Sequence, residues 1–137
     1  MGTQPNEQQA LVLFAHGARA ASWAAPFERL RDLTQARLPD TNVHLAFLEL
    51  MTPRLPELVQ SLLADLPGEG TLDVTVVPVF LGQGGHVLRD LPLLAEQLRH
   101  AHPRLRLKVV EAVGENAQVL AAIADYCVAA PGSPSDA

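Results

Sequence analysis

The amino-acid sequence predicts a single-domain α/β protein, with a mostly four-stranded parallel sheet and helices on both faces of that sheet. Apolar runs of strand length alternate four times with segments of helical periodicity, the pattern of doubly wound βα repeats. The 137 residues match the usual size of one domain, about 100–150 residues. Hydrophobic residues make up 48% of the chain and aromatic residues only 4%, so we expect an aliphatic core.

The first unit begins with Ala10–Ala15, a continuous apolar run that predicts a buried strand. A helix is expected from Ser22, a candidate N-cap, as far as Pro39. Its apolar residues recur at helical spacing: Phe27, Leu30 and Leu33. Asn42–Leu48 is rich in valine, leucine and phenylalanine and predicts the second strand.

Thr52 followed by Pro53 predicts the start of the second helix, because proline is favoured at the first helical position. The apolar residues of this helix fit one face: Leu55, Leu58, Val59, Leu62, Leu63 and Leu66. Asp73–Phe80 predicts the third strand, in which Pro78 marks a bulge or the strand's end. A third helix is expected to start near Asp90, after a glycine-rich loop.

Leu105–Ala112 predicts the fourth strand, and Asn116 is a candidate N-cap for the last helix. Cys127 lies in the apolar stripe of that helix and is interpreted as a small core residue. Residues 10–128 are expected to form the domain. Residues 1–9 and 129–137 are polar or rich in proline, glycine and serine, and are expected to be disordered.

Composition excludes several classes of protein. The formal net charge of −5 argues against a nucleic-acid binder, which needs a basic face. The chain contains no apolar run near the roughly 20 residues of a transmembrane helix, and its first residues do not resemble a secretory signal. A single cysteine excludes an intrachain disulfide framework. We therefore expect a cytoplasmic protein with no membrane or nucleic-acid partner.

Three titratable residues from three βα junctions are expected at one edge of the sheet. His16 ends the first strand, Glu49 ends the second, and His86 follows the third. Right-handed crossovers place all carboxyl ends of parallel strands at the same edge, where such sheets bind ligands. Glu111 and Glu115 lie near the end of the fourth strand. Each residue also has a plainer interpretation, as a structural histidine or as a solvated or helix-capping glutamate.

The glycine-rich loop, Gly82 to Gly85, matches neither a dinucleotide-binding fingerprint nor a P-loop. One interpretation is a turn that needs positive φ angles. The other is that Gly84 and Gly85 let the backbone approach a bulky ligand while His86 is aimed at it.

Three segments carry a family resemblance. Leu13–Arg19 reads LFAHGAR, Phe47–Pro53 reads FLELMTP, and Val77–Asp90 contains P-x-F-L-x-x-G-x-H-V-x-x-D. They resemble the H-G-S-R opening, the acidic second-strand segment and the most specific block of the small class II tetrapyrrole chelatases, the CbiX/SirB family. The likeness covers Ala10 to Cys127 and implies a chelatase-like, flavodoxin-like fold. One departure is Ala18, where the family usually carries serine.

The resemblance implies a lyase that inserts a divalent metal such as Co²⁺, Fe²⁺ or Ni²⁺ into sirohydrochlorin or a related tetrapyrrole without ATP. His16 and His86 would be the catalytic, metal-binding imidazoles and Glu49 their acidic partner. The metal would be a substrate, and no permanently bound cofactor is expected. The resemblance leaves open the metal, the choice between cobalamin and sirohaem pathways, and which histidine accepts protons.

The implied tetrapyrrole carries many carboxylates, so arginines close to strand ends are candidate substrate ligands, because guanidinium pairs bidentately with carboxylate. Arg19 and Arg89 are the main candidates and Arg54 a further one. All three could equally be ordinary surface residues.

Longer relatives pair two such domains around one cleft, which implies a symmetric homodimer for a single-domain chain. The dimer's two strand-end edges would then face each other. Two alternatives remain: a metal or tetrapyrrole carrier with the same ligands but no turnover, and a phosphate- or nucleotide-binding regulator supported by the glycine-rich loop alone.

Overall fold

The computed structural model describes residues 7–82 and 84–132, with the backbone alone at residues 85, 86 and 88. Within them lie four strands, β1 (Glu7–Ala15), β2 (Asn42–Phe47), β3 (Thr71–Pro78) and β4 (Leu105–Val109). The α-helices are α1 (Ala25–Arg37), α2 (Leu55–Ala64), α3 (Gly85–Ala101) and α4 (Ala117–Ala129). Short 3₁₀ helices are η1 (Ala21–Ala24), η2 (Val113–Glu115) and η3 (Ala130–Gly132).

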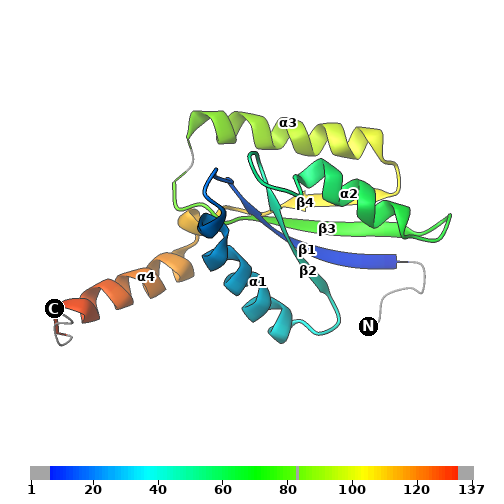
Figure 1. Cartoon of the computed structure of the whole chain (residues 1–137). Helices are drawn as coiled ribbons and strands as arrows, with labels where there is room; N and C mark the ends of the chain where they lie inside the picture. Colours follow the sequence, from blue (N-terminus) through cyan, green and yellow to red (C-terminus); the bar gives the residue numbers. More distant parts are fainter. Residues whose placement is uncertain (1–6, 83, 133–137) are drawn as a thin grey trace.

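All neighbouring strands pair in parallel, in the order β2-β1-β3-β4. α1 lies on one face of the sheet, and α2 and α3 cover the other (Figure 1). The predicted α/β class and four-stranded parallel sheet are therefore confirmed. Chain order reverses between β1 and β3, so the carboxyl ends of these two strands flank the switch point of the sheet.

The main core lies between the sheet and helices α2 and α3. Alternate residues of β3 point into it and are buried: Leu72, Val74, Val76 and Pro78. The intervening residues face α1's side and are only half-buried: Thr71, Asp73, Thr75 and Val77. A smaller cluster beneath α1 joins Leu13, Val43, Leu45 and Phe47 with Phe27. The two faces of the sheet are thus unequally covered.

Two helices begin later than predicted. Ser22 is not an N-cap but lies inside η1, and α1 begins at Ala25. The Thr52–Pro53 peptide bond is cis, and the Phe47 amide donates to the Pro53 carbonyl over 2.9 Å. Residues 48–53 therefore form a loop that returns to β2, and α2 begins only at Leu55.

Helix α3, by contrast, begins at Gly85 rather than near Asp90, and it contains Pro92. Its buried stripe explains the longer helix, since Val87 and Leu91 lie on the same apolar face as the expected core residues Ala95 and Leu98.

Strand limits also differ. β1 begins at Glu7 rather than Ala10, because Glu7–Gln9 pair with β3. β2 and β4 end at Phe47 and Val109, earlier than expected, and β3 ends at Pro78, as one of the two interpretations of that proline predicted.

Helix α4 departs most from expectation. Asn116 caps it as predicted, since its Oδ1 accepts hydrogen bonds from the amides of Gln118 (3.0 Å) and Val119 (3.1 Å). None of its residues is buried, however, and Cys127 is exposed, so the interpretation of that cysteine as a core residue is wrong. The helix projects from the carboxyl edge of the sheet, away from the strands (Figure 1).

Candidate functional site

His16 occupies the switch point of the sheet. It is the first residue after β1, is half-buried, and its ring packs against Phe80, with 5.3 Å between ring centroids. Phe80 follows β3, the neighbouring strand across the switch point, and also contacts Phe14 of β1 edge-to-face. Ligands of open α/β sheets bind at this position, so the structure places His16 where the sequence predicted a site.

The loops after β1 and β2 are joined by backbone hydrogen bonds. The Leu48 amide donates to the Ala15 carbonyl over 2.9 Å, and the Glu49 amide donates to the His16 carbonyl over 3.2 Å. Glu49 itself is exposed. His16 and Glu49 are therefore brought together at one edge, as predicted.

Gly17 makes this approach possible. Its φ is +93°, a conformation that side chains disfavour, and a Cβ at this position would overlap the Glu49 carbonyl oxygen. Among the described residues, the positive φ expected of the glycine-rich loop belongs instead to Gly17 and Leu50. Gly84 has a φ of −72° and caps α3.

Two further contacts hold the loop after β3. The Val79 amide donates to the Phe14 carbonyl and the Gly114 amide to the Phe80 carbonyl, both over 2.9 Å. A Cβ at Gly114 would overlap the Leu81 backbone, so η2 lies directly against this loop. Phe80 is thus held between β1 and η2, which fixes the surface against which His16 packs.

His86 is the second residue of α3, and its side chain lies outside the described part of the structure. The backbone places His86 at the start of a helix that follows the β3 loop, on the carboxyl side of the sheet (Figure 1). Among the described side chains, no group of three or more His, Cys, Asp or Glu could hold a metal ion.

The candidate arginines have different surroundings. Arg19 is exposed and lines a hollow of about 600 Å³ beside Leu50, Met51 and Pro53. Arg89 is exposed on α3. Arg54, by contrast, is engaged with Glu57, since its amide donates to Oε1 (2.9 Å) and its guanidinium lies 3.5 Å from the same atom.

The acidic residues after β4 form a different arrangement. Glu111 accepts a hydrogen bond from Asn116 Nδ2 over 2.8 Å, and with Glu115 it lines a cavity of about 530 Å³ beside α3. Glu111 thereby supports the cap of α4.

Sequence reasoning missed two apolar side chains at the carboxyl edge. Leu50, with a φ of +67°, and Leu81 are 57% and 65% exposed, in the loops after β2 and β3. The signal that could have identified them is a large apolar residue, leucine, within a loop that is expected to face solvent. They give the carboxyl edge exposed apolar side chains in the loops that follow β2 and β3.

His44, interpreted as a half-buried structural residue, is half-buried in β2. Burial, and to a smaller extent the charge of Arg31, lowers the pKa of His44. Its buried Nε2 has no hydrogen-bond partner among the described residues.

No helix of the described chain combines the length and apolar character needed to span a membrane.

Known proteins resemble this chain in sequence and in fold. Residues 10–129 match the CbiX family. A sirohydrochlorin cobaltochelatase of Methanocaldococcus jannaschii is 30% identical over 94 residues, which cover 69% of this chain and 63% of that protein. A second, from Methanococcus aeolicus, is 29% identical over 61% of this chain and 56% of that protein. The chain thus matches less than two thirds of these relatives' length.

Solved structures agree. A CbiX protein from Marinobacter aquaeolei VT8 superposes with a TM-score of 0.73 at 30% identity, covering 88% of this chain and 94% of that one. SirB from Bacillus subtilis with Fe³⁺ gives 0.73 at 20% identity, covering 93% of this chain and 48% of SirB, and shows the same fold. The match over nearly all the described chain shows that this protein belongs to the CbiX family.

Proposed function

We propose that this protein is a class II chelatase, a lyase that inserts a divalent metal into sirohydrochlorin or a related tetrapyrrole without ATP. The observation that carries the proposal is His16 at the switch point, held by backbone hydrogen bonds beside the Glu49 loop. Family membership and the names of the methanogen relatives support the substrate class. The metal is a substrate, and no permanently bound cofactor is proposed.

The chemistry requires the metal to be held weakly and two pyrrole protons to be removed. Imidazole and carboxylate ligands suit first-row divalent metals without the strong binding of thiolates. We assign His16, Glu49 and His86 to the metal, and His16 and His86 also to catalysis. As each pyrrole N–H loses its proton and a nitrogen–metal bond forms, a neutral imidazole is a base suited to accept that proton. Co²⁺, Fe²⁺ and Ni²⁺ are all candidates.

The substrate is a planar ring with acidic arms, and the edge offers surface for both. The exposed side chains of Leu50 and Leu81 provide apolar contact for the ring. The exposed Arg19 and Arg89 are assigned to the carboxylate arms, to which guanidinium can bind bidentately. Gly84 and Gly85 are assigned to close approach of the backbone; at Gly84 the space beside Cα is open.

The edge of one chain is an open surface, so we also propose a symmetric homodimer in which two carboxyl edges form one cleft. Each chain would contribute one His16, Glu49 and His86. The cytoplasmic location expected from the sequence stays a prediction.

An absorbance assay tests the function. Sirohydrochlorin is mixed with Co²⁺, Fe²⁺ or Ni²⁺, with and without protein, and the metallated product is followed over time. His16→Ala is expected to lower the insertion rate by about a hundredfold or more, as for loss of a general base. Glu49→Gln should also lower it. His100→Ala, in the last turn of α3, is the matched control and should insert metal at the wild-type rate.

Wild-type rates in His16→Ala would contradict the assignment of His16. Tight stoichiometric binding with no acceleration would instead identify a carrier. Stabilisation of the fold by nucleotides, without any effect of tetrapyrrole, would favour the nucleotide-binding alternative.

A further inference from the structure

Leu50 has a backbone conformation that leucine rarely adopts. Its φ is +67°, which makes it the one non-glycine residue with a positive φ in the part of the chain that the structure describes. Glycine and asparagine reach this left-handed region at lower cost. The Leu50 side chain is also 57% exposed, so packing within the chain does little to offset the strain. A ligand that contacts this side chain would account for a leucine at this position.

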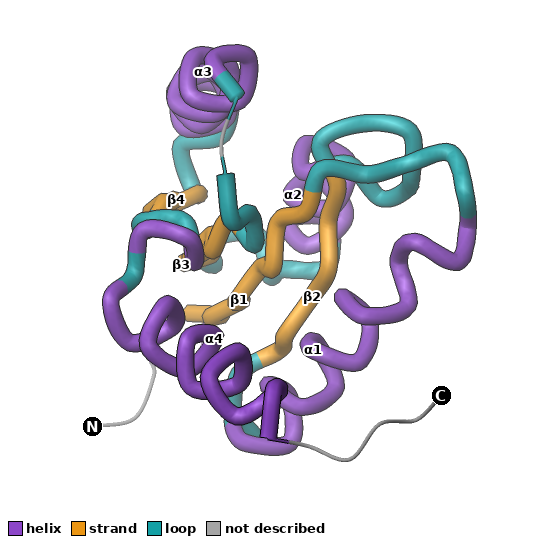
Figure 2. The backbone as a smooth tube through the Cα atoms, turned by 90° about the vertical axis from the view of Figure 1, so that its left-hand side faces the viewer, coloured by secondary structure: helices purple, strands orange, loops and turns teal. Residues whose placement is uncertain are grey.

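The loop that carries Leu50 is held at both ends. The Glu49 amide donates to the His16 carbonyl over 3.2 Å, and the Phe47 amide donates to the Pro53 carbonyl over 2.9 Å. Figure 2 shows the loops that follow β1 and β2 side by side at the carboxyl edge of the sheet. Such contacts on either side of a strained residue keep it in place, so the Leu50 side chain is presented in a set position.

A hollow of about 600 Å³, here called the arginine hollow, begins directly after Glu49 in the chain. Its lining includes Leu50, Met51, Thr52 and Pro53, and Glu49 is not part of it. Consecutive Cα atoms are about 3.8 Å apart, so the hollow starts one residue away from the carboxylate assigned to the metal. A flat molecule that is centred beside Glu49 and reaches into the hollow therefore crosses Leu50.

The charged side chains of the arginine hollow favour an anion. Arg19, after β1, and Arg31, on α1, line the hollow together with one carboxylate, that of Glu28. Two guanidinium groups therefore face a single carboxylate. Arg31 is otherwise paired at 3.1 Å with Asp32, its neighbour in the chain, in an exposed ion pair of the kind that contributes little to stability. Arg31 can exchange this pair for a bidentate bond to a carboxylate of a ligand.

We infer that the arginine hollow binds one acidic arm of the tetrapyrrole, and that Leu50 supports the ring where it crosses from Glu49 to the hollow. The inference rests on the proposed function and adds the direction in which the ring lies. Arg31, which sequence reasoning did not single out, joins Arg19 as a ligand of that arm. These contacts are the same before and during metal insertion, so they set the affinity for the ring rather than the rate of insertion.

Titration with metal-free sirohydrochlorin, followed by absorbance, tests the contact with Leu50. Leu50→Asn introduces a residue that tolerates a positive φ but removes the apolar contact, and it should raise the Kd about tenfold. Its unfolding temperature should stay at or above the wild-type value, because the strain falls. Leu50→Met restores an apolar side chain and should bind within about threefold of wild type. Leu93→Asn, 58% exposed on α3, is the matched control and should bind like wild type.

The acidic arm is tested by changing both the protein and the ligand. Arg31→Gln should raise the Kd about tenfold, because a charge-assisted bond to a carboxylate is lost. A ring whose carboxylates are esterified should bind wild type more weakly, and Arg31→Gln should lower its affinity no further. Arg29→Gln, exposed on the same helix and outside the hollow, is the control and should bind both rings like wild type. An equal loss with the esterified ring would show that Arg31 does not bind a carboxylate and would overturn the inference.

The insertion assay separates affinity from chemistry. Leu50→Asn and Arg31→Gln should each lower kcat/KM about tenfold, mainly through a higher KM, as expected for contacts that bind substrate and transition state alike. A fall in kcat at unchanged KM would contradict the inference.

The remaining outcomes distinguish this inference from the proposed function. Wild-type affinity in Leu50→Asn or in Arg31→Gln would overturn the inference and leave the proposed function intact. In particular, a Leu50→Asn chain that dimerises more weakly in sedimentation but binds the ring normally would show that Leu50 contacts a second chain instead. Weakened ring binding in both variants of a chain that inserts no metal would contradict the proposed function alone. A wild-type chain that does not bind metal-free sirohydrochlorin would overturn both.

Discussion

At the scale of single residues, the site depends on backbone contacts more than on side-chain bonds. His16 owes its place to Gly17, which lets the Glu49 carbonyl approach, and to Phe80, against which its ring packs. A sequence of parallel βα units predicts that His16 and Glu49 share an edge. It does not predict Phe80 or Gly114, since their roles depend on how two loops pass each other.

Gly17→Ala is expected to destabilise the fold by about 2–4 kcal/mol, because the new Cβ would meet the Glu49 carbonyl and the residue would keep a left-handed φ. Urea unfolding measures the effect. Gly82→Ala, where nothing lies within 4 Å of the added Cβ, is the control and should shift stability by less than about 1 kcal/mol. Equal effects at both sites would show that the backbone of Gly17 and Glu49 can move apart to accommodate the added Cβ.

His44 should make stability depend on pH. Burial, then the charge of Arg31, lowers its pKa in the folded state. The unfolded chain therefore takes up the proton first as the pH falls below about 6.5, and stability present above that pH is progressively lost until the folded pKa is passed. His44→Gln should lose less free energy of unfolding than wild type between about pH 7 and about pH 5. Parallel curves for the two proteins would contradict this.

At the scale of elements, buried strands were easier to predict than helix starts. The strands were found because their apolar runs reflect burial on the sheet. The start of α2 was misplaced because Thr52–Pro53 fits a helix start and a loop equally well, and only the bond from Phe47 to Pro53 distinguishes them. The start of α3 was missed because Gly85 and Pro92 are poor helix formers that the buried stripe overrides.

For α4, the expected burial of the apolar stripe in this chain's own core is wrong. Helical spacing predicts that a face will be buried but does not say by what, and the sequence interpretation assigned Cys127 to this chain's own core. Its exposure shows that no contact within the described chain buries that stripe.

Asn116→Ala should loosen α4 without affecting the sheet. The side chain satisfies two amides at the helix start, and α4 has no buried residue to compensate for their loss. A lost N-cap costs about 1 kcal/mol. Amide hydrogen exchange should therefore accelerate in α4 and stay unchanged in β1 and β3. Asn42→Ala, exposed at the start of β2, is the control.

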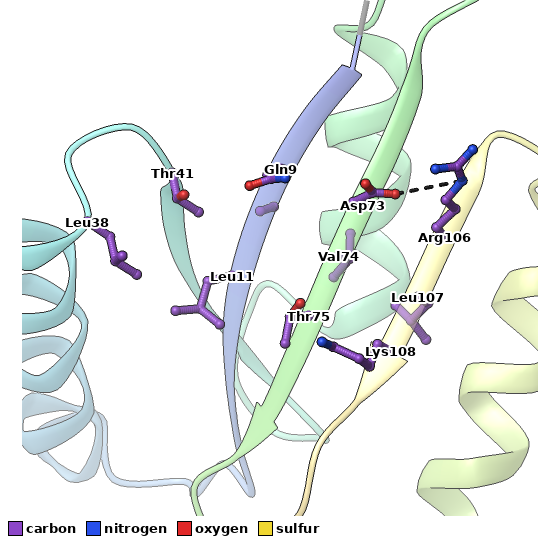
Figure 3. A pocket seen from close by; sticks show the side chains of 11 residues that line it. Gln9, Leu11, Leu38, Thr41, Asp73, Val74, Thr75, Arg106, Leu107 and Lys108 are labelled. Carbon is purple, nitrogen blue, oxygen red and sulfur yellow. Dashed lines mark ion pairs between the residues drawn. The ribbon is translucent and has the colours of Figure 1, made fainter. Parts of the chain in front are cut away.

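At the scale of the whole molecule, the sheet is covered fully on one face and partly on the other. The α2–α3 face holds the larger core, whereas on the α1 side the half-buried Thr75 of β3 lines a hollow of about 450 Å³ together with Leu11 and Leu38 (Figure 3). The order β2-β1-β3-β4 places the switch point between β1 and β3. The second face is only partly covered because α1 is the one described helix that packs on it, while α4 projects from the edge.

Paired substitutions in β3 should report this difference. Val76 is fully buried toward α2 and α3, so Val76→Ala should cost about 2–4 kcal/mol of unfolding free energy. Its neighbour Val77 points to the opposite, half-covered face, and Val77→Ala should cost about 1 kcal/mol in the dilute monomer. Denaturant unfolding at low protein concentration makes the comparison. A similar cost at both positions would show that the α1 face is packed as well as the other.

Under the homodimer proposed above, the position of the switch point at the carboxyl edge links the number of complete clefts to the amount of this protein. Because each proposed cleft needs two chains, the law of mass action governs how many complete clefts exist. In dilute solution their number varies with the square of the protein concentration, so halving the supply of chains removes about three quarters of the clefts. If the proposed function holds, a small supply of this chain would give few complete clefts, and a modest rise in synthesis would raise metal insertion disproportionately.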